Sequence, residues 1–240
     1  MTTVVVGASG ATGRLLVEQL LKHGEPVRII VRMGSNLPAQ IEKHENLSII
    51  HASLLELGDD EMARHVKGCS AVASCLGHNL TFKGMFGQPR RLVTDATRRL
   101  CSAIKANKPK TPVKYVLMNT TGNSNRDLDE RITFAQACVI WLLRLLLPPH
   151  VDNEKAAEYL RTRIGQNDDE VEWAAVRPDG LIDADKVTGY EIYPSPVRSA
   201  IFDAGTTSRI NVAHFMAELV TDKNTWNKWK GKMPVIYNKA

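Results

Sequence analysis

Three glycines, each three residues from the next, follow the first apolar run of the chain. Residues 4–16 read Val-Val-Val-Gly-Ala-Ser-Gly-Ala-Thr-Gly-Arg-Leu-Leu. The valines predict a buried strand, and the apolar residues from Leu16 onward recur at helical spacing. In such a strand–turn–helix unit Gly7 permits the tight turn, Gly10 lets the backbone approach a pyrophosphate, and Gly13 lets the helix pack on the strand. We therefore predict an α/β unit that opens with a dinucleotide-binding turn.

Short apolar runs and amphipathic segments then alternate along the chain. Strands are expected at residues 4–6, 27–31, 47–50, 71–76, 113–118, 171–176 and 234–237. Helices are expected from residue 16 to 22, up to residue 43, and at 59–66, 90–106, 132–147, 152–164 (capped by Asp152) and 211–221. Apolar strands separated by helices are typical of a parallel sheet covered on both faces. We predict a doubly wound, mostly parallel, Rossmann-like α/β fold. It forms a single domain over residues 1–240, with a core of 1–180 and an irregular substrate-side lid and C-terminal region of 181–240.

Composition excludes several classes of protein. With 43% hydrophobic and 24% charged residues among 240, the chain is neither disordered, nor collagen-like, nor a coiled coil. Four irregularly spaced cysteines do not form a secreted disulfide scaffold, and Cys69 and Cys75 lack the spacing of a zinc site, so we expect buried thiols and no metal. No charged leader with an apolar core begins the sequence, and a cytoplasmic location is expected.

Two segments bear on partners. The apolar stretch 132–147 is too short to span a bilayer and contains Arg144, so it predicts a core helix or a helix shared in a homodimer, with no membrane partner. Residues 90–114 hold eight basic residues and one acid within a chain of net charge +5. Aromatic residues are not interleaved there, which argues against nucleic acid. A solvated basic helix face is favoured, with steering of an anionic ligand as the alternative.

The end of the second expected strand indicates which dinucleotide binds. Arg32 lies there, 19 residues beyond Gly13, where an NAD site usually carries Asp or Glu for the ribose 2′-hydroxyl. A guanidinium pairs well with a 2′-phosphate. We therefore predict NADP(H) as the cofactor in preference to NAD(H). Arg14 either adds a second charge or lies in solvent.

These residues resemble the atypical short-chain dehydrogenase/reductase superfamily, in its NAD(P)H-binding, NmrA-like branch, and within it the biliverdin reductase B/flavin reductase type. The resemblance covers nearly the whole chain. It rests on the glycine turn, on Arg32, and on the segments Ser74–His78, Met118–Thr121, Ala175–Gly180 and Ser208–Ala213. The resemblance implies a small-molecule substrate and a cofactor held by Leu76 and Gly77. It places Ser53 where such proteins often hold an adenine-contacting Asp. The residues expected to contact the cofactor are Gly7, Ser9, Gly10, Ala11, Thr12, Gly13, Arg14, Arg32, Ser53, Leu54, Leu76, Gly77, Thr120 and Pro178.

The catalytic pattern departs from the main branch of that superfamily, which uses Tyr-x-x-x-Lys. Lys155 stands at the lysine position, but Val151 replaces the tyrosine. Reduction of an ordinary ketone needs a proton donor near the developing alkoxide, whereas a conjugated acceptor can take its proton from solvent. The remaining catalytic candidates are Thr120 and Thr121 at the superfamily's Ser/Thr position, Lys155, and His78 as a proton donor.

Two functions follow from this pattern. One is an NADP(H)-dependent reductase of a conjugated small molecule such as a flavin, a quinone or a tetrapyrrole. The alternative is a non-catalytic NADP(H)-binding sensor or regulatory protein of the NmrA-like type. An epimerase or dehydratase that uses tightly held NAD is disfavoured by Arg32 and by the absence of Tyr-x-x-x-Lys.

Overall fold

A computed structural model of the protein describes residues 2–78, 81, 84, 86–130 and 132–239. Its centre is an eight-stranded sheet with the order β3-β2-β1-β4-β5-β6-β10-β8. Adjacent strands from β3 to β10 pair in parallel, and β8 joins β10 antiparallel. The first six strands have the order of doubly wound Rossmann sheets. The predicted mostly parallel α/β fold is confirmed.

The strands lie close to their expected positions. The main sheet comprises β1 (Thr2–Val6), β2 (Val27–Val31), β3 (Leu47–His51), β4 (Cys69–Ser74), β5 (Val113–Met118), β6 (Val171–Pro178), β8 (Tyr190–Tyr193) and β10 (Val235–Asn238). A second, two-stranded sheet pairs β7 (Gly180–Ile182) with β9 (Thr206–Ser208). Strand β6 runs through Arg177 and Pro178, where the sequence predicted its end. Both residues form backbone hydrogen bonds with other segments: Arg177 N donates to Pro234 O, and Pro178 O accepts from Thr121 N.

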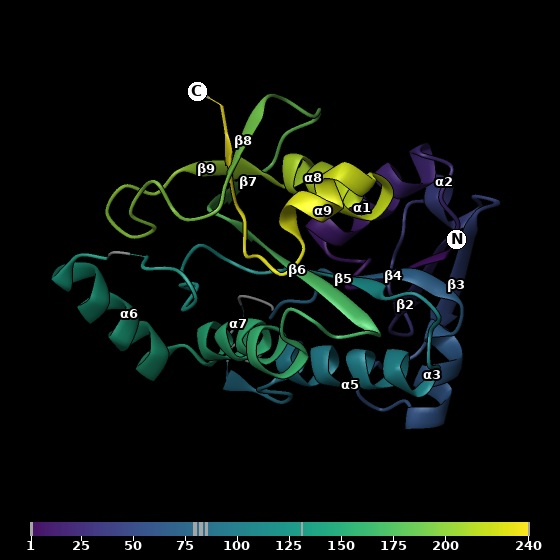
Figure 1. Cartoon of the computed structure of the whole chain (residues 1–240). Helices are drawn as coiled ribbons and strands as arrows, with labels where there is room; N and C mark the ends of the chain where they lie inside the picture. The colour runs from purple at the N-terminus through teal and green to yellow at the C-terminus, as the bar shows by residue number, and fades with distance from the viewer. Residues whose placement is uncertain (1, 79–80, 82–83, 85, 131, 240) are drawn as a thin grey trace.

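Helices cover both faces of the sheet (Figure 1). On one face lie α1 (Ala11–Lys22), α8 (Arg209–Thr221) and α9 (Lys223–Trp229), and on the other α3 (Asp59–Val66), α5 (Leu92–Ala106) and α7 (Pro148–Tyr159). The short α2 (Ala39–Glu42) follows β2, and α7 continues into a π-helical turn, Leu160–Ile164. Because side chains alternate along a strand, Val5 packs under α1 and α8 whereas Val4 and Val6 pack toward α5. One apolar core therefore forms on each face.

One predicted helix boundary needs correction, and one helix was not predicted. The helix expected at 152–164 begins at Pro148, because proline at the first positions of a helix has no N–H to lose. Asp152 therefore lies inside α7 and does not cap it. The helix α9 had no predicted counterpart.

The C-terminal region contains the predicted helix 211–221 as α8 and the predicted strand 234–237 as β10. Strands β8 and β10 extend the main sheet, and α8 packs against α1. Residues 181–239 thus contribute to the fold itself, and their role as a substrate-side lid stays a prediction.

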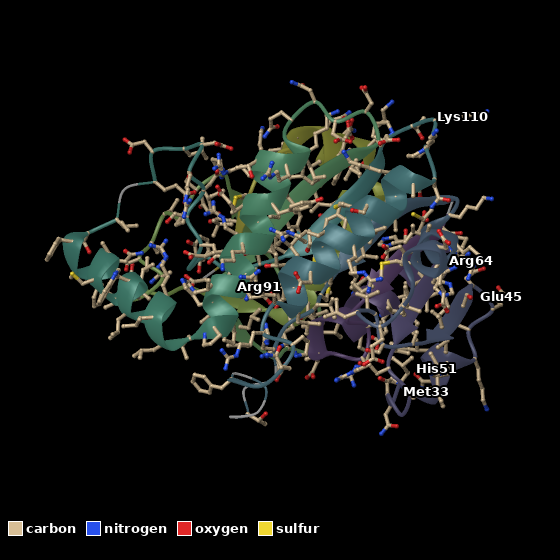
Figure 2. All side chains as sticks on the ribbon, turned by 90° about the horizontal axis from the view of Figure 1, so that it is seen from below. Met33, Glu45, His51, Arg64, Arg91 and Lys110 are labelled. Atoms are coloured by element: carbon tan, nitrogen blue, oxygen red, sulfur yellow. The ribbon has the colours of Figure 1, made fainter. Side chains whose placement is uncertain are left out.

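The helix α6 (Phe134–Leu146) stands away from both layers. Figure 1 shows it projecting at one side of the molecule, and Figure 2, turned by 90°, places it at the same side, beyond α7. Within the described residues no single helix has the length and apolar character to cross a membrane. Only α6 combined with the segment Pro148–Ile164 reaches that length, and the two are bent by 104°.

Candidate functional site

A cavity of about 760 Å³ lies at the carboxyl ends of the parallel strands. It is centred where the chain order reverses between β1 and β4, the place where doubly wound sheets bind ligands. Its volume is typical of small-molecule and cofactor sites. The lining residues are Val6, Gly7, Ser9–Thr12, Ile30–Arg32, Ala52–Glu56, Cys75–His78, Gly84, Gln88, Pro89, Leu92, Met118, Asn119 and Asn153.

The turn between β1 and α1 requires glycine at two positions. Gly7 has a φ of +75°, and a Cβ on it would lie 2.6 Å from the backbone of Cys75 at the end of β4. A Cβ on Gly13 would lie 2.1 Å from the carbonyl oxygen of Gly7. Both distances are far below van der Waals contact, so side chains there would separate the helix from the strands. These are the roles that the sequence predicted for Gly7 and Gly13.

The N-terminus of α1 opens into the cavity. Gly10 is the N-cap residue, no side chain caps the helix, and its first turn has no acid. The first-turn amides have no partner within the helix, and the helix dipole places positive charge there. Gly10, Ala11 and Thr12 all line the cavity. This end of the helix therefore fits a diphosphate.

Arg32 lies at the side of the cavity where β2 ends, and its side chain is exposed to solvent. Ser53 and Leu54, both predicted site residues, line the cavity beside it in the turn after β3. Arg99 of α5 fixes that turn by donating to the carbonyl oxygens of Leu54 (3.1 Å) and Leu55 (2.8 Å). This wall of the cavity is therefore held in place by partly buried hydrogen bonds.

Charges of both signs line this end of the cavity. Arg32 is the cation, and Glu56, which the sequence analysis did not identify, is the single acid among the described lining residues.

His78 and Asp152 meet at the opposite end of the cavity. His78 Nε2 lies 2.8 Å from Asp152 Oδ2, and His78 Nδ1 lies 3.2 Å from the carbonyl oxygen of Gly84. Both side chains are nearly inaccessible, with 4% and 1% exposure. Because each ring nitrogen faces an acceptor, both can be satisfied only if both carry protons. This arrangement favours the protonated, imidazolium form of His78.

Asp152 also caps a helix, but not its own. Its carboxylate accepts hydrogen bonds from the backbone amides of Val93 (2.8 Å) and Thr94 (2.9 Å) in the first turn of α5, where Arg91 supplies no side-chain cap. The hydrogen bond with Asp152 raises the pKa of His78. Burial alone would raise the pKa of Asp152, but the hydrogen bonds from His78 and Thr94 outweigh it and leave that pKa below its ordinary value.

The predicted site residues divide into two groups. Gly7, Ser9, Gly10, Ala11, Thr12, Arg32, Ser53, Leu54, Leu76, Gly77 and His78 line the cavity, whereas Gly13, Arg14, Thr120, Thr121, Lys155 and Pro178 do not. Lys155 and Arg14 are exposed to solvent. Thr121 Oγ1 donates to Asp179 Oδ1 (3.1 Å) in the interior, which gives this hydroxyl a structural partner.

Sequence reasoning missed Met118, Asn119 and Asn153 as lining residues. Asn119 directly follows β5, so the rule that ligands bind at strand ends could have identified it. Its side-chain oxygen accepts from Thr120 N (2.8 Å) and its amide donates to Asn153 O (3.0 Å). Asn153 could be assigned only from the packing of α7 against the sheet.

The basic stretch 90–114 is not simply a solvated face. The guanidinium of Arg98 lies 5.6 Å from the centre of the Tyr159 ring, and Lys105 pairs with Asp168. Lys114 donates to the carbonyl oxygen of Val220 at the end of α8 (2.6 Å). These cations bind other parts of the same chain, whereas Arg90, Arg91, Lys108 and Lys110 are exposed, as expected of a solvated basic face.

The cysteines carry no metal cluster in the described part of the chain, where no group of three His, Cys, Asp or Glu residues converges. Cys69 is buried, as expected, whereas Cys75 is half-buried and lines the cavity. Burial raises the pKa of Cys69 to about 11 and that of Cys75 to about 12. Both therefore remain protonated thiols near neutral pH.

Several solved structures are similar to this one. One is a short-chain dehydrogenase/reductase from Veillonella parvula in complex with NADP, 16% identical over 100% of this chain and 95% of the other, with a TM-score of 0.69. Another is ChuY, an anaerobilin reductase from Escherichia coli, 14% identical over 99% and 97%, with a TM-score of 0.70. A candidate NADH-flavin reductase from Streptococcus pneumoniae is 19% identical over 100% of both chains, with a TM-score of 0.66. At these identities the likeness shows the fold alone.

No curated protein sequence matches the chain. A family described as NAD(P)H-binding, however, matches residues 7–223, which extend from the glycine turn into α9. The predicted resemblance is thereby confirmed at the level of family and fold. This chain belongs to the NAD(P)H-binding family.

Proposed function

We propose that this protein is an NADP(H)-dependent reductase of a conjugated small molecule such as a flavin, a quinone or a tetrapyrrole. One observation carries the proposal: the amides of the glycine turn, the guanidinium of Arg32 and the imidazole of His78 line one cavity. The three groups suit, in order, a diphosphate, a 2′-phosphate and a hydride acceptor on which negative charge develops.

The chain's own residues would hold the dinucleotide along this cavity. The N-terminus of α1 would bind the diphosphate through its free amides. Arg32 would pair with the 2′-phosphate, and Leu76, Gly77 and Asn119 would border the nicotinamide. When bound, the nicotinamide supplies the hydride, and positioning provides most of the catalysis.

His78 would act on the acceptor through its charge. An imidazolium held beside the reacting groups stabilises negative charge that develops on the acceptor. It could also supply a proton from Nδ1, whose 3.2 Å contact with the carbonyl oxygen of Gly84 is longer than the 2.8 Å contact between Nε2 and Asp152. A conjugated acceptor needs no stronger acid, which is consistent with Val151 at the usual tyrosine position and with the exposure of Lys155.

Two features support a second candidate function. No Tyr-x-x-x-Lys pair is present in the sequence, and both ring nitrogens of His78 are engaged by protein acceptors. A site of this kind could bind NADP(H) without turnover and report its redox state to a partner. A turnover assay separates the two functions.

The cofactor assignment is tested by calorimetry with NADPH and NADH. We expect the substitution Arg32→Glu to weaken NADPH binding about 10- to 100-fold, since a charged hydrogen bond contributes roughly 1.5–3 kcal/mol, and to weaken NADH binding much less. Arg14→Glu is the matched control, because Arg14 is an exposed arginine next to the same turn but outside the cavity. Equal losses for both nucleotides with Arg32→Glu would refute the assignment.

The reaction is tested by mixing the protein with NADPH and a panel of FMN, quinones and biliverdin, and following the nicotinamide absorbance. Turnover of any acceptor supports the reductase. Tight NADPH binding without turnover on the whole panel supports the sensor.

A further inference from the structure

The helix α6 is apolar on nearly its whole circumference but is covered on one side only. It packs chiefly on α7, and only Gln136 and Ile140 among its thirteen residues are buried. Gln136 Oε1 accepts from Ser199 Oγ (3.0 Å), which ties the helix to the loop before β9. A helix that is hydrophobic all round is normally enclosed. The free side of α6 therefore lacks a partner among the residues that the structure describes.

The exposed side of α6 forms an outer seam, defined here as Phe134, Cys138, Trp141 and Leu145. The residues follow one another at intervals of four, three and four, the spacing with which one helix packs along another. Phe134, Trp141 and Leu145 are 85%, 64% and 66% exposed, and Cys138 is exposed too. Leu142 and Leu146 flank the seam and are about half exposed.

Charge argues against an acidic or basic partner and against a lipid surface. Arg144 is the single charged residue of α6, and Glu154 of α7 engages its guanidinium through three contacts of 2.8–3.0 Å. A helix that lies in a membrane interface needs a strongly charged polar face. The outer seam has none, so its partner must be equally apolar.

The outer seam is complementary to itself when two copies run antiparallel. A two-fold axis between residues 139 and 140 places Phe134 of one helix opposite Leu145 of the other, and Cys138 opposite Trp141. Each large side chain then meets a smaller one. The spacing of the sequence thus satisfies the requirement of a two-fold interface that the same patch serves both chains.

The available area is that of a stable interface. The exposed apolar side chains on and beside α6 are Phe134, Trp141, Leu142, Leu145, Leu146, Val197 and Phe202. Together they offer on the order of 700 Å² for burial, given roughly 150–250 Å² for each aromatic. A standard interface buries about 800 Å² on each partner.

We propose that this protein forms a two-fold dimer in which the outer seams of two α6 helices pack antiparallel. The dimer is independent of the proposed reductase function, because no residue of α6 lines the cavity. It would enclose the helix that the fold leaves uncovered and would brace α7, which carries Asp152 and Asn153.

Sedimentation of the full chain across the micromolar range tests the proposal. We expect a mass twice the 26.6 kDa of one chain. Trp141→Glu or Leu145→Glu should raise the dissociation constant roughly 100-fold or more, because each would bury an unpaired carboxylate at the interface. Met33→Glu is the control, since Met33 is a 79% exposed apolar residue on the cavity side of the molecule. A monomeric wild-type chain would overturn the proposal. So would a monomer that floats with anionic phospholipid vesicles.

Disulfide trapping tests the antiparallel register. In a Cys138→Ser background, the double variant Phe134→Cys with Leu145→Cys should give a covalent dimer on mild oxidation. The two positions lie about 16 Å apart within one helix, so they cannot bridge in the same chain. Either single variant should stay uncross-linked. A covalent dimer from Phe134→Cys alone would indicate parallel helices and contradict the proposed interface.

Discussion

Replacing Asp152 by alanine tests whether one buried carboxylate holds together two walls of the cavity. The carboxylate accepts from the amides of Val93 and Thr94 at 2.8 and 2.9 Å and lies 2.8 Å from His78 Nε2. It thereby joins α5, α7 and the segment after β4. The substitution removes all three interactions at once, and its methyl group cannot replace any of them.

The expected loss of stability can be built from these contacts. Loss of a helix N-cap costs roughly 0.5–2 kcal/mol. Leaving His78 without its partner in a nearly inaccessible position costs about 1–3 kcal/mol more. We therefore expect Asp152→Ala to lower the free energy of unfolding by about 2–5 kcal/mol, and the melting temperature by roughly 5–15 °C for a chain of this size.

The same substitution should change the pH dependence of stability. The folded-state pKa of His78 is raised, so its contribution is fully present below the unfolded value near 6.5 and is lost as pH rises through the folded pKa. The pKa of Asp152 is lowered, so its contribution is present above its unfolded value and is lost as pH falls through the folded pKa. Wild-type stability should decline as pH rises above about 6.5, and Asp152→Ala should remove most of that decline.

Urea unfolding monitored by circular dichroism at a series of pH values measures both effects. Asp222→Ala is the matched control, because Asp222 also caps a helix, accepting from Thr225 N at 2.6 Å, but is exposed and binds no histidine. It should lower stability through the lost helix cap alone, without the change in pH dependence above 6.5. If Asp152→Ala destabilised no more than this control, or kept the wild-type pH dependence, the link between His78 and Asp152 would be refuted.

Two further predictions concern the packing around the site. Gly13→Ala should lower the free energy of unfolding by about 1–3 kcal/mol, because its Cβ would lie 2.1 Å from Gly7 O. Gly10→Ala places its Cβ 3.2 Å from the same atom and should cost under about 1 kcal/mol. Equal losses in thermal unfolding would refute this reasoning. In the wild-type protein the guanidinium of Arg177 lies 2.6 Å from the buried Glu130 carboxylate. Arg177→Met leaves that carboxylate without its partner and should lower the free energy of unfolding by about 3–5 kcal/mol. Adding Glu130→Gln should recover part of that loss, and no recovery in urea unfolding would show that the ion pair is not its source.

Local patterns determined the part of the fold that depends on neighbouring residues. The β-branched run of β2 and the apolar run of β5 identified these strands with their observed ends, 27–31 and 113–118. The glycine turn and Arg32 identified one half of the cavity, because their roles arise from a single strand–turn–helix unit and the strand after it.

Tertiary structure alone decided the other half of the cavity. The sequence predicted Asp152 as an N-cap because it precedes a helical pattern. Its hydrogen-bond donors are instead backbone amides of α5, 58 and 59 residues away in the chain. No periodicity in the sequence records a hydrogen bond across that separation. The segment that contains β8 looked irregular because this strand is only four residues long, and it becomes a strand by pairing with β10, which in turn pairs with β6. The chain itself specified the cofactor turn, whereas the packing of distant elements specified what surrounds His78, because contacts between remote segments depend on three-dimensional approach and leave no local pattern.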